Sequence, residues 1–217
     1  MMRKTEIKHH KSCAFVISNF DCGCIRVFLR ESNAIEGVHG DESVEVSVKA
    51  WEYLVQQDVI TNEVILETHK LLMKNQKSLK RKEKGVYRTI EVGIYKQNII
   101  GIDPDGDKLL IEKVKVRDLL KAKLIQKKLD KWIKYLNKLV GKVPKIEEWV
   151  LEARIKKDHV EFESIHPFVD GNGRIGRLLM NWERIKLGLP IIIIYEKSKG
   201  EYYAWFREMT IVSRKKT

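Results

Sequence analysis

The sequence has few cysteines and no apolar run long enough to cross a bilayer. Its longest apolar stretch, residues 190–194, has only the length of a strand. The first twenty residues are basic, but they contain a short apolar patch and no small-residue cleavage site, so we expect no signal peptide. Cys13, Cys22 and Cys24 cannot all pair with one another, and no second Cys/His cluster completes a metal site with them. These absences predict a cytoplasmic protein with reduced thiols and no membrane partner.

Internal repeats and Pro/Gly/Ser-rich linkers are also absent, so we expect a single domain from the 217 residues. The net charge of +12 is concentrated in residues 70–145, where 22 Lys/Arg stand against 8 Asp/Glu. Such a surface can attract nucleic acid, acidic protein or nucleotide phosphate. Few aromatic residues lie between the lysines for base stacking, and no nucleic-acid-binding signature accompanies them. Nucleic acid is therefore not favoured as a partner, and a solvated lysine-rich face is the simplest interpretation.

Apolar periodicity predicts a mainly α chain. Helices are expected over residues 42–57, 61–74, 116–139, 147–165, 174–187 and 201–212, with Thr61 as the N-cap of the second. Residues 85–102 alternate in polarity instead, and their polar residues 96–98 predict the turn of a β-hairpin. Residues 103–107 do not have the Gly and Glu of an EF-hand loop at the required positions, so they are expected to form a simple turn.

The stretch HPFVDGNGRIGR, residues 166–177, contains a literal G-x-G-x-x-G. A dinucleotide-binding turn would place its first glycine directly after a strand, whereas five residues intervene here after the alternating VEFESI. Two arginines flank the third glycine, and the chain does not have the β/α alternation of a doubly wound sheet. This interpretation is therefore not favoured.

The same twelve residues can hold phosphate in another way. Pro167 disfavours helical geometry at His166, so the preceding helix should end there and leave an imidazole in a loop. The glycines let main-chain N–H groups approach an anion at the start of the next helix, whose dipole favours negative charge. Arg174 and Arg177 project from one side of that helix, and Asp170 is suited to hold Mg²⁺ through one oxygen.

This stretch resembles the signature of the Fic family, His-x-Phe-x-(Asp/Glu)-Gly-Asn-Gly-Arg-x-x-Arg, at every specified position. The similarity also includes GVYRTIEV, HVEFESIHPF, RLLMNW and GEYYAWF, and it spans roughly residues 31–209. The resemblance implies a compact Fic-type helical bundle with a β-hairpin flap. In that arrangement an N-terminal segment (1–30) precedes helices that include an inhibitory one (31–80), and a core (81–212) contains the flap (about 85–102) and the catalytic loop (166–177), all within one compact domain.

The resemblance implies transfer of AMP from ATP, with Mg²⁺, to a Ser, Thr or Tyr hydroxyl of a target protein. It assigns the role of general base to His166 and the binding of the metal to Asp170. The ordinary pKa of an imidazole suits a general base at neutral pH. The resemblance further assigns phosphate binding to Gly171, Asn172, Gly173, Arg174 and Arg177, adenosine contact to Tyr202 and Tyr203, and target binding by strand addition to the flap around Ile94 and Tyr95. The intact Asn-Gly-Arg core favours AMP transfer over phosphorylation.

A second motif, SNAIEG at residues 32–37, is similar to the family's inhibitory motif, (Ser/Thr)-x-x-x-Glu-(Gly/Asn). Ser32 and Glu36 would lie on a helix that ends at Gly37. The resemblance implies that Glu36 pairs with Arg177 where the γ-phosphate should sit, so that the inhibitor belongs to the same chain.

The sequence departs from the family in two places, which leave flap geometry and target choice open. The proline-rich run that commonly follows the flap is replaced by IIGIDPDGDK, and no C-terminal recognition domain is expected beyond residue 212. The reverse reaction, removal of AMP from a protein, and a basic nucleic-acid-binding module that keeps a nucleotide loop both remain alternatives. The target protein, self-modification and homodimer formation are left open by the sequence.

Overall fold

Helices make up most of the regular structure in the computed structural model, which describes residues 23–102, 109–141 and 147–214 and the side chains of 23–93, 119–141 and 147–206. The long helices are α1 (Gly23–Ile35), α2 (Asp41–Val55), α3 (Asn62–Leu72), α4 (Ile125–Val140), α5 (Glu148–Ile165), α6 (Asn172–Lys186) and α7 (Lys199–Arg214). Three 3₁₀ turns connect described elements: η1 (Arg81–Glu83), η2 (Ala122–Leu124) and η3 (Glu196–Ser198). The expectation of a mainly α protein is confirmed.

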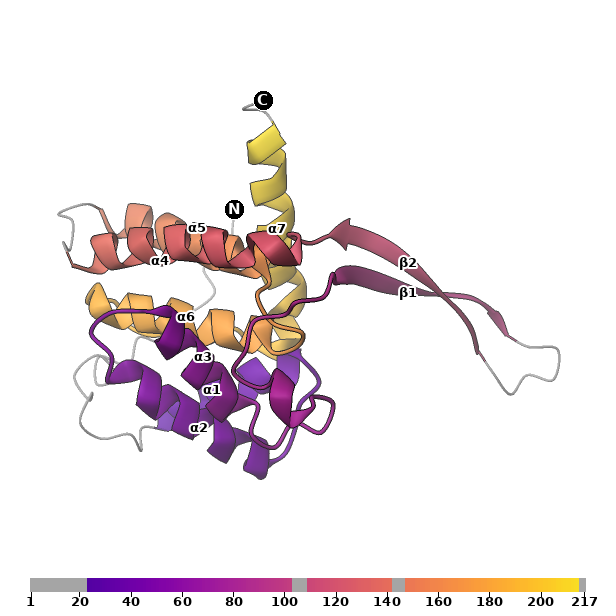
Figure 1. Cartoon of the computed structure of the whole chain (residues 1–217), viewed down its shortest axis with the longest axis horizontal. Coiled ribbons are helices and arrows are strands. Elements are labelled where there is room, and N and C mark those ends of the chain that lie inside the picture. Colours follow the sequence, from indigo (N-terminus) through magenta and orange to yellow (C-terminus); the bar gives the residue numbers. More distant parts are fainter. Residues whose placement is uncertain (1–22, 103–108, 142–146, 215–217) are drawn as a thin grey trace, which may run out of the picture.

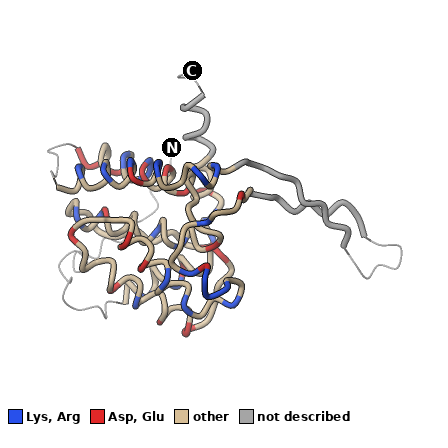
Figure 2. The backbone as a smooth tube through the Cα atoms, viewed as in Figure 1, with Lys and Arg blue, Asp and Glu red and all other residues tan. Residues whose placement is uncertain are grey.

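The amphipathic pattern positions the helices as predicted over most of the chain. Thr61 caps α3 by accepting a hydrogen bond from the Val64 N–H, at 3.2 Å. Helices α4 and α5 lie on one side of α6, and α1, α2 and α3 lie on the other (Figure 1). The lysines of α4 form a solvated face as expected, because Lys127, Lys128, Lys131, Lys134 and Lys138 are exposed (Figure 2).

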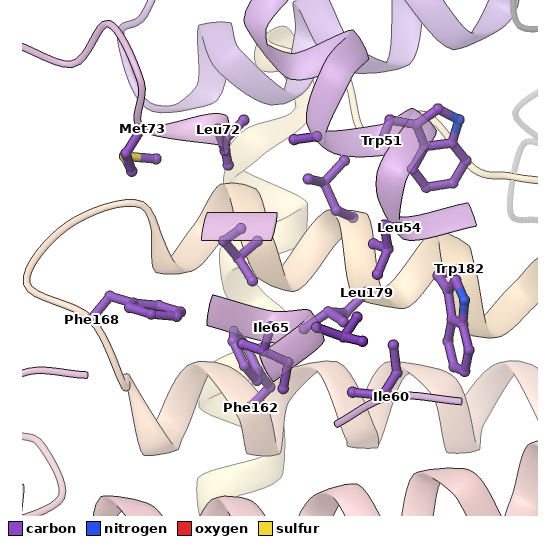
Figure 3. Packing of buried hydrophobic residues seen from close by; sticks show 14 of the residues in the cluster. Trp51, Leu54, Ile60, Ile65, Leu72, Met73, Phe162, Phe168, Leu179 and Trp182 are labelled. Carbon is purple, nitrogen blue, oxygen red and sulfur yellow. The ribbon is translucent and has the colours of Figure 1, made fainter. Parts of the chain in front are cut away.

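Helix α6 is the centre of the fold. It contacts each of α1 to α5, and every residue from Arg174 to Arg184 is buried. Leu179 and Trp182 of α6 pack within a cluster that includes Leu54 of α2 and Ile65 of α3 (Figure 3). The buried surface of α6 also carries charged side chains, which is unusual unless they have partners or a function. The candidate catalytic loop, which begins at His166, leads directly into this helix.

A long antiparallel hairpin projects from the helical body (Figure 1). It is formed by β1 (Gly93–Ile102) and β2 (Leu109–Asp118), paired from Gly93 opposite Asp118 to Ile102 opposite Leu109. The turn predicted at residues 96–98 is wrong, because these residues pair with residues 112–114 inside the ladder. The helix expected from residue 116 begins instead at Ile125, since residues 109–118 alternate as a strand. The turn expected at residues 103–107 lies outside the described residues.

Two further expectations concern chemistry and location. Cys24 is disulfide-bonded, so the prediction of reduced thiols is wrong for this residue. Three cysteines do not exclude a single bridge. Cys13 and Cys22 lie outside the described residues. Within the described residues, every helix is too short or too polar to cross a membrane.

Candidate active site

His166 stands at the C-terminal end of α5 in a left-handed conformation. Its φ and ψ angles are 50° and 62°, which is uncommon for a residue other than glycine. Its main-chain N–H donates to the Phe162 carbonyl at 3.1 Å and closes the last turn. Pro167 then prevents the helix from continuing. The strained residue is therefore also the proposed base, as is common where a fold constrains a functional group.

Arg88 holds the start of the catalytic loop. Its Nε donates to the His166 carbonyl at 2.8 Å, and its main-chain N–H donates to the Pro167 carbonyl at 2.8 Å. The same guanidinium donates to the carbonyls of Ile90 and Leu120, which precede β1 and follow β2. Arg88 is buried, so these bonds form away from solvent. The conformation at His166 is therefore tied to both ends of the hairpin.

Two side chains fold the loop between His166 and α6. Phe168 is fully buried and its ring stacks on that of His69 of α3, with centroids 3.8 Å apart and planes within 2°. Asn172 receives the Phe168 N–H at 2.8 Å on Oδ1 and donates to the Phe168 carbonyl at 2.9 Å through Nδ2. The Asn172 side chain therefore closes the loop on both main-chain groups of Phe168, through Oδ1 and one of the two N–H groups of Nδ2.

His69 is held as a neutral imidazole of one tautomer. Its Nδ1 accepts the Gly85 N–H at 2.9 Å, so the proton lies on Nε2, which donates to the Asp170 carbonyl at 3.1 Å. Burial lowers the pKa of His69 to about 4, and the nearby Arg174 acts in the same direction. A neutral ring can pack on Phe168 without the cost of a buried charge.

The Asp170 carboxylate lies at the edge of the loop. Oδ1 accepts the Gly171 N–H at 2.6 Å, whereas Oδ2 has only longer contacts with Ser78 Oγ (3.3 Å) and Gln76 Nε2 (3.5 Å). The described residues contain no cluster of three or more His, Cys, Asp or Glu that could hold a metal. A single half-buried carboxylate suits Mg²⁺, which commonly takes its other oxygens from phosphates and water.

Two glycines of the loop are required by close contacts. Gly171 has a φ of 83°, and a Cβ there would lie 2.4 Å from the Met73 methyl group. A Cβ at Gly173 would lie 2.2 Å from Glu36 Oε1 and 3.1 Å from Arg177 Nη1. The first glycine therefore permits the turn into α6, and the second leaves space for an oxygen atom beside Arg177.

Arg174 is a buried cation with few partners. Its Nη2 lies 3.5 Å from the Met73 sulfur, and its Nε has no hydrogen-bond partner in the described part of the protein. Burial lowers the pKa of Arg174, while Asp170 and Glu36 oppose that shift. A guanidinium has five N–H donors, so this one can still bind an anion at the N-terminus of α6.

Arg177 is the most completely paired residue of the site. Its guanidinium donates from Nε to Ser32 Oγ (2.9 Å) and from Nη2 to the Ser32 carbonyl and to Glu36 Oε1 (both 2.8 Å). Glu36 lies in the turn just after α1, which ends at Ile35 rather than at Gly37. The salt bridge expected between Glu36 and Arg177 is therefore present, although the two residues are separated by 141 positions.

Buried polar side chains contact Arg177, and a separate buried acid lies beside His166. Arg177 Nη1 donates to the Tyr202 hydroxyl at 3.3 Å, and His159 Nε2 lies 2.9 Å from the same oxygen. Burial raises the pKa of Glu163 to about 8, against the opposing effect of Arg177, which favours the uncharged form of this acid. Glu163 Oε2 is 4.0 Å from His166 Nδ1. The proposed base thus has a buried acid beside it.

The structure brings together most of the residues selected from the sequence. His166, Asp170, the glycines and the two arginines surround the N-terminus of α6, with Ser32 and Glu36 beside Arg177. Tyr202 is buried with its hydroxyl on Arg177, whereas Tyr203 is 43% exposed. Ile94 and Tyr95 belong to β1, but their side chains are outside the described set.

Several residues that shape the site were missed from the sequence. Two of them, His69 and Arg88, lie far from the signature in the sequence and bind main-chain carbonyls. The third, Glu163, lies on α5 just before the signature. The one available signal was a polar residue on an apolar helical face: His69 lies four residues after Ile65, and both are buried in α3.

Comparison with known proteins finds relatives of similar sequence. A protein called adenylyltransferase Fic from Drosophila mojavensis is 45% identical over 49 residues, which is 23% of this chain and 10% of that protein. Its counterpart in Drosophila grimshawi is 43% identical over the same length. The match thus covers a tenth of the length of these curated relatives.

Solved structures show the same fold. A Fic domain containing signaling protein from Bacteroides thetaiotaomicron superposes with a TM-score of 0.65 at 18% identity, covering 89% of this chain and 77% of the other. Fic-1 from C. elegans, in a form described as E274G, gives 0.53 at 21% identity and covers 89% and 61%. A family model described as Fic/DOC family matches residues 59–183. Because that match covers more than half of the residues and includes the whole loop, the chain belongs to the Fic/DOC family.

Proposed function

We propose that this protein transfers AMP from ATP to a hydroxyl group of a target protein, and that Glu36 restrains the transfer. The observation that carries the proposal is the state of Arg174. It is a buried guanidinium with an unpartnered Nε among the described residues, beside a second buried guanidinium at Arg177. Burying a cation is costly unless an anion compensates it, and the N-terminus of a helix adds to the attraction for phosphate.

The proposed reaction uses four side chains of the site. His166 accepts the proton of the target hydroxyl while the hydroxyl oxygen forms a bond to the α-phosphorus of ATP. The bond between the α-phosphorus and the oxygen bridging to the β-phosphate breaks, and pyrophosphate leaves. Arg174 and Arg177 stabilise the charge that develops on the leaving group, as fixed cations can do without reorganisation. Asp170 would hold Mg²⁺, which supplies further charge stabilisation when bound.

Glu36 is proposed to hold the site closed. Its carboxylate occupies one edge of Arg177 through the gap left by Gly173. A γ-phosphate would use the same guanidinium edge, since carboxylate and phosphate both pair with arginine in this way. Bound ATP must therefore displace Glu36 or accept another pose. The names of the curated Drosophila relatives support the reaction type.

The test uses two preparations of ATP, one labelled at the α-phosphate and the other at the γ-phosphate. The protein of 217 residues, its Glu36→Gly variant and a Glu36→Gly/His166→Asn variant are incubated with Mg²⁺ and a cell lysate. We expect label from the α-phosphate, and none from the γ-phosphate, to be incorporated by Glu36→Gly and not by the double variant. Incorporation of the γ-label would indicate phosphoryl transfer and overturn the proposal. Loss of an α-label already attached to protein would instead identify the reverse reaction.

A further inference from the structure

The segment between α3 and Gly85 is strongly basic. Residues 74–84, here named the basic loop, contain six Lys/Arg and one Glu in the sequence KNQKSLKRKEK. The single acid is used internally, because Glu83 Oε2 accepts the Lys80 N–H at 2.7 Å. No Lys or Arg of the basic loop forms an ion pair with any residue that the structure describes. The loop therefore presents uncompensated positive charge.

The basic loop is held in place rather than hanging from the surface. Leu79 is buried, and Lys84 Nζ donates to the Lys74 carbonyl at 2.8 Å, which joins the two ends. The loop includes Gln76 and Ser78, whose side chains contact the Asp170 carboxylate. Five of the six cations are nevertheless exposed: Lys74, Lys77, Lys80, Arg81 and Lys82. In Figure 2 this blue group lies on the lower part of the molecule, on the same side as the start of the hairpin.

The placement indicates the kind of partner. Phosphates of the nucleotide would be held by the buried Arg174 and Arg177, so the exposed cations are left for a larger anion. No aromatic residue occurs in residues 74–84, and the following Tyr87 is half-buried with its hydroxyl bonded to Asn62, so bases would find no stacking surface. A protein substrate would bring its hydroxyl to His166, and the loop that begins at His166 contacts the basic loop through Asp170.

We propose that the basic loop is a docking surface for an acidic segment of the protein substrate. The proposal rests on the proposed AMP transfer for the identity of the partner. Opposite charges at such a surface increase the rate of encounter and select the substrate, more than they add affinity. Binding should therefore weaken with added salt, because exposed charges are screened.

The first measurement is binding without ATP. The probe is a fluorescent peptide of about ten glutamates, and its Kd is measured by anisotropy at low and at physiological ionic strength. Lys77→Glu/Arg81→Glu/Lys82→Glu should weaken binding by about tenfold or more. The matched control, Lys127→Glu/Lys128→Glu/Lys131→Glu, changes the net charge equally with exposed lysines of α4 and should change the Kd by less than about twofold. Equal loss in both variants, or no loss in either, would overturn the proposal, as would tighter binding of single-stranded DNA of the same charge.

The second measurement separates docking from chemistry. In the Glu36→Gly background, AMP transfer to a random glutamate–tyrosine copolymer is followed with α-labelled ATP. The basic-loop changes should raise the KM for the copolymer while leaving kcat and the KM for ATP unchanged. A fall in kcat alone would count against docking. If no acceptor is labelled by any variant, the proposed function fails, while the peptide binding still decides whether the basic loop binds acidic segments.

Discussion

Arg177 is bound by three parts of the chain at once. Ser32 of α1 accepts through its hydroxyl and its carbonyl, Tyr202 of α7 accepts through its hydroxyl, and Glu36 supplies a carboxylate. Ser32 and Tyr202 are buried, whereas the Glu36 side chain keeps 36% of its surface exposed. An incoming anion can therefore replace Glu36 without disturbing the other bonds. Arg177 should keep its position when Glu36 is absent.

The first prediction concerns this removable partner. Glu36→Gly should increase AMP incorporation by at least about tenfold, because a charge-assisted hydrogen bond of Arg177 becomes available to the nucleotide. The rate of incorporation from α-labelled ATP measures the effect. Adding Arg177→Ala to this variant should abolish the gain. Unchanged labelling in Glu36→Gly would show that the salt bridge has no inhibitory role.

The second prediction tests the base. His166→Asn removes the imidazole but suits the left-handed backbone, which asparagine tolerates better than alanine. We expect AMP transfer to fall by about 10²–10⁴-fold, the usual contribution of a general base. The shift in Tm on adding Mg-ATP should remain, since the phosphate-binding arginines are unchanged. Activity within a few-fold of the original protein would exclude His166 as the base.

Among the elements, the hairpin and the catalytic loop are joined through Arg88. The hairpin begins at Gly93 and ends at Asp118, and Arg88 bonds to carbonyls just outside each of these ends as well as to His166. A displacement of either strand would therefore act on the backbone of His166. In the proposed reaction, a target segment that binds along the hairpin could therefore change the position of His166.

The third prediction follows from these bonds. Arg88→Met should lower the free energy of unfolding by about 2–4 kcal/mol, because several carbonyls lose their donor at a buried position. Arg88→Lys should restore only part of this, since an ammonium cannot reproduce the planar fork. Urea unfolding measures both, with the exposed Arg81→Met as the control. A cost for Arg88→Met no larger than that of Arg81→Met would contradict the assignment.

The helices of this protein were easier to predict from the sequence than its hairpin. Helices α2, α3 and α5 were predicted to within a few residues, because one buried face repeats along each of them. The hairpin was misplaced because residues 85–92 alternate as a strand does, although they form the irregular segment that carries Arg88. The motif from His166 to Arg177 could be found because its residues are consecutive. Arg88 could not be found in this way, because the groups that it binds are main-chain carbonyls that no pattern of side chains marks. His69 was marked only as a polar residue on an apolar helical face.

At the scale of the whole molecule, buried titratable groups should govern stability against pH. Burial lowers the pKa of His69 to about 4 and that of His159 to about 3. Burial raises the pKa of Glu163 to about 8, and burial beside the Asp158 carboxyl also raises the pKa of Glu183. As the pH falls, the histidines bind protons in the unfolded chain before they do so in the folded chain. They therefore reduce the free energy of unfolding as the pH falls below about 6.5. The glutamates keep protons longer in the folded chain, so they reduce stability as the pH rises from about 4.5 to 9.

The fourth prediction combines these opposing effects. They partly cancel between about pH 4.5 and 6.5, and above that range only the loss from the glutamates remains. The free energy of unfolding should therefore fall between pH 6.5 and 9 by on the order of 2 kcal/mol or more, at about 1.4 kcal/mol per pH unit for each group that stays protonated only when folded. Urea unfolding at several pH values measures the fall.

Glu183→Gln should reduce this alkaline loss, because the amide does not ionise, whereas the exposed Glu148→Gln should leave it unchanged. A stability that is level from pH 6.5 to 9 in the original protein would contradict the raised pKa values of the buried glutamates.

The contact between Glu36 and Arg177 determines how displacement of Glu36 depends on the concentrations of nucleotide and protein. Both groups belong to one chain, so the effective concentration of the carboxylate at the guanidinium is set by the fold and does not change on dilution. A nucleotide that binds in its place must do so by mass action against this constant local concentration. The fraction of molecules in which Glu36 is displaced would then depend on the amount of nucleotide in solution and not on the amount of protein.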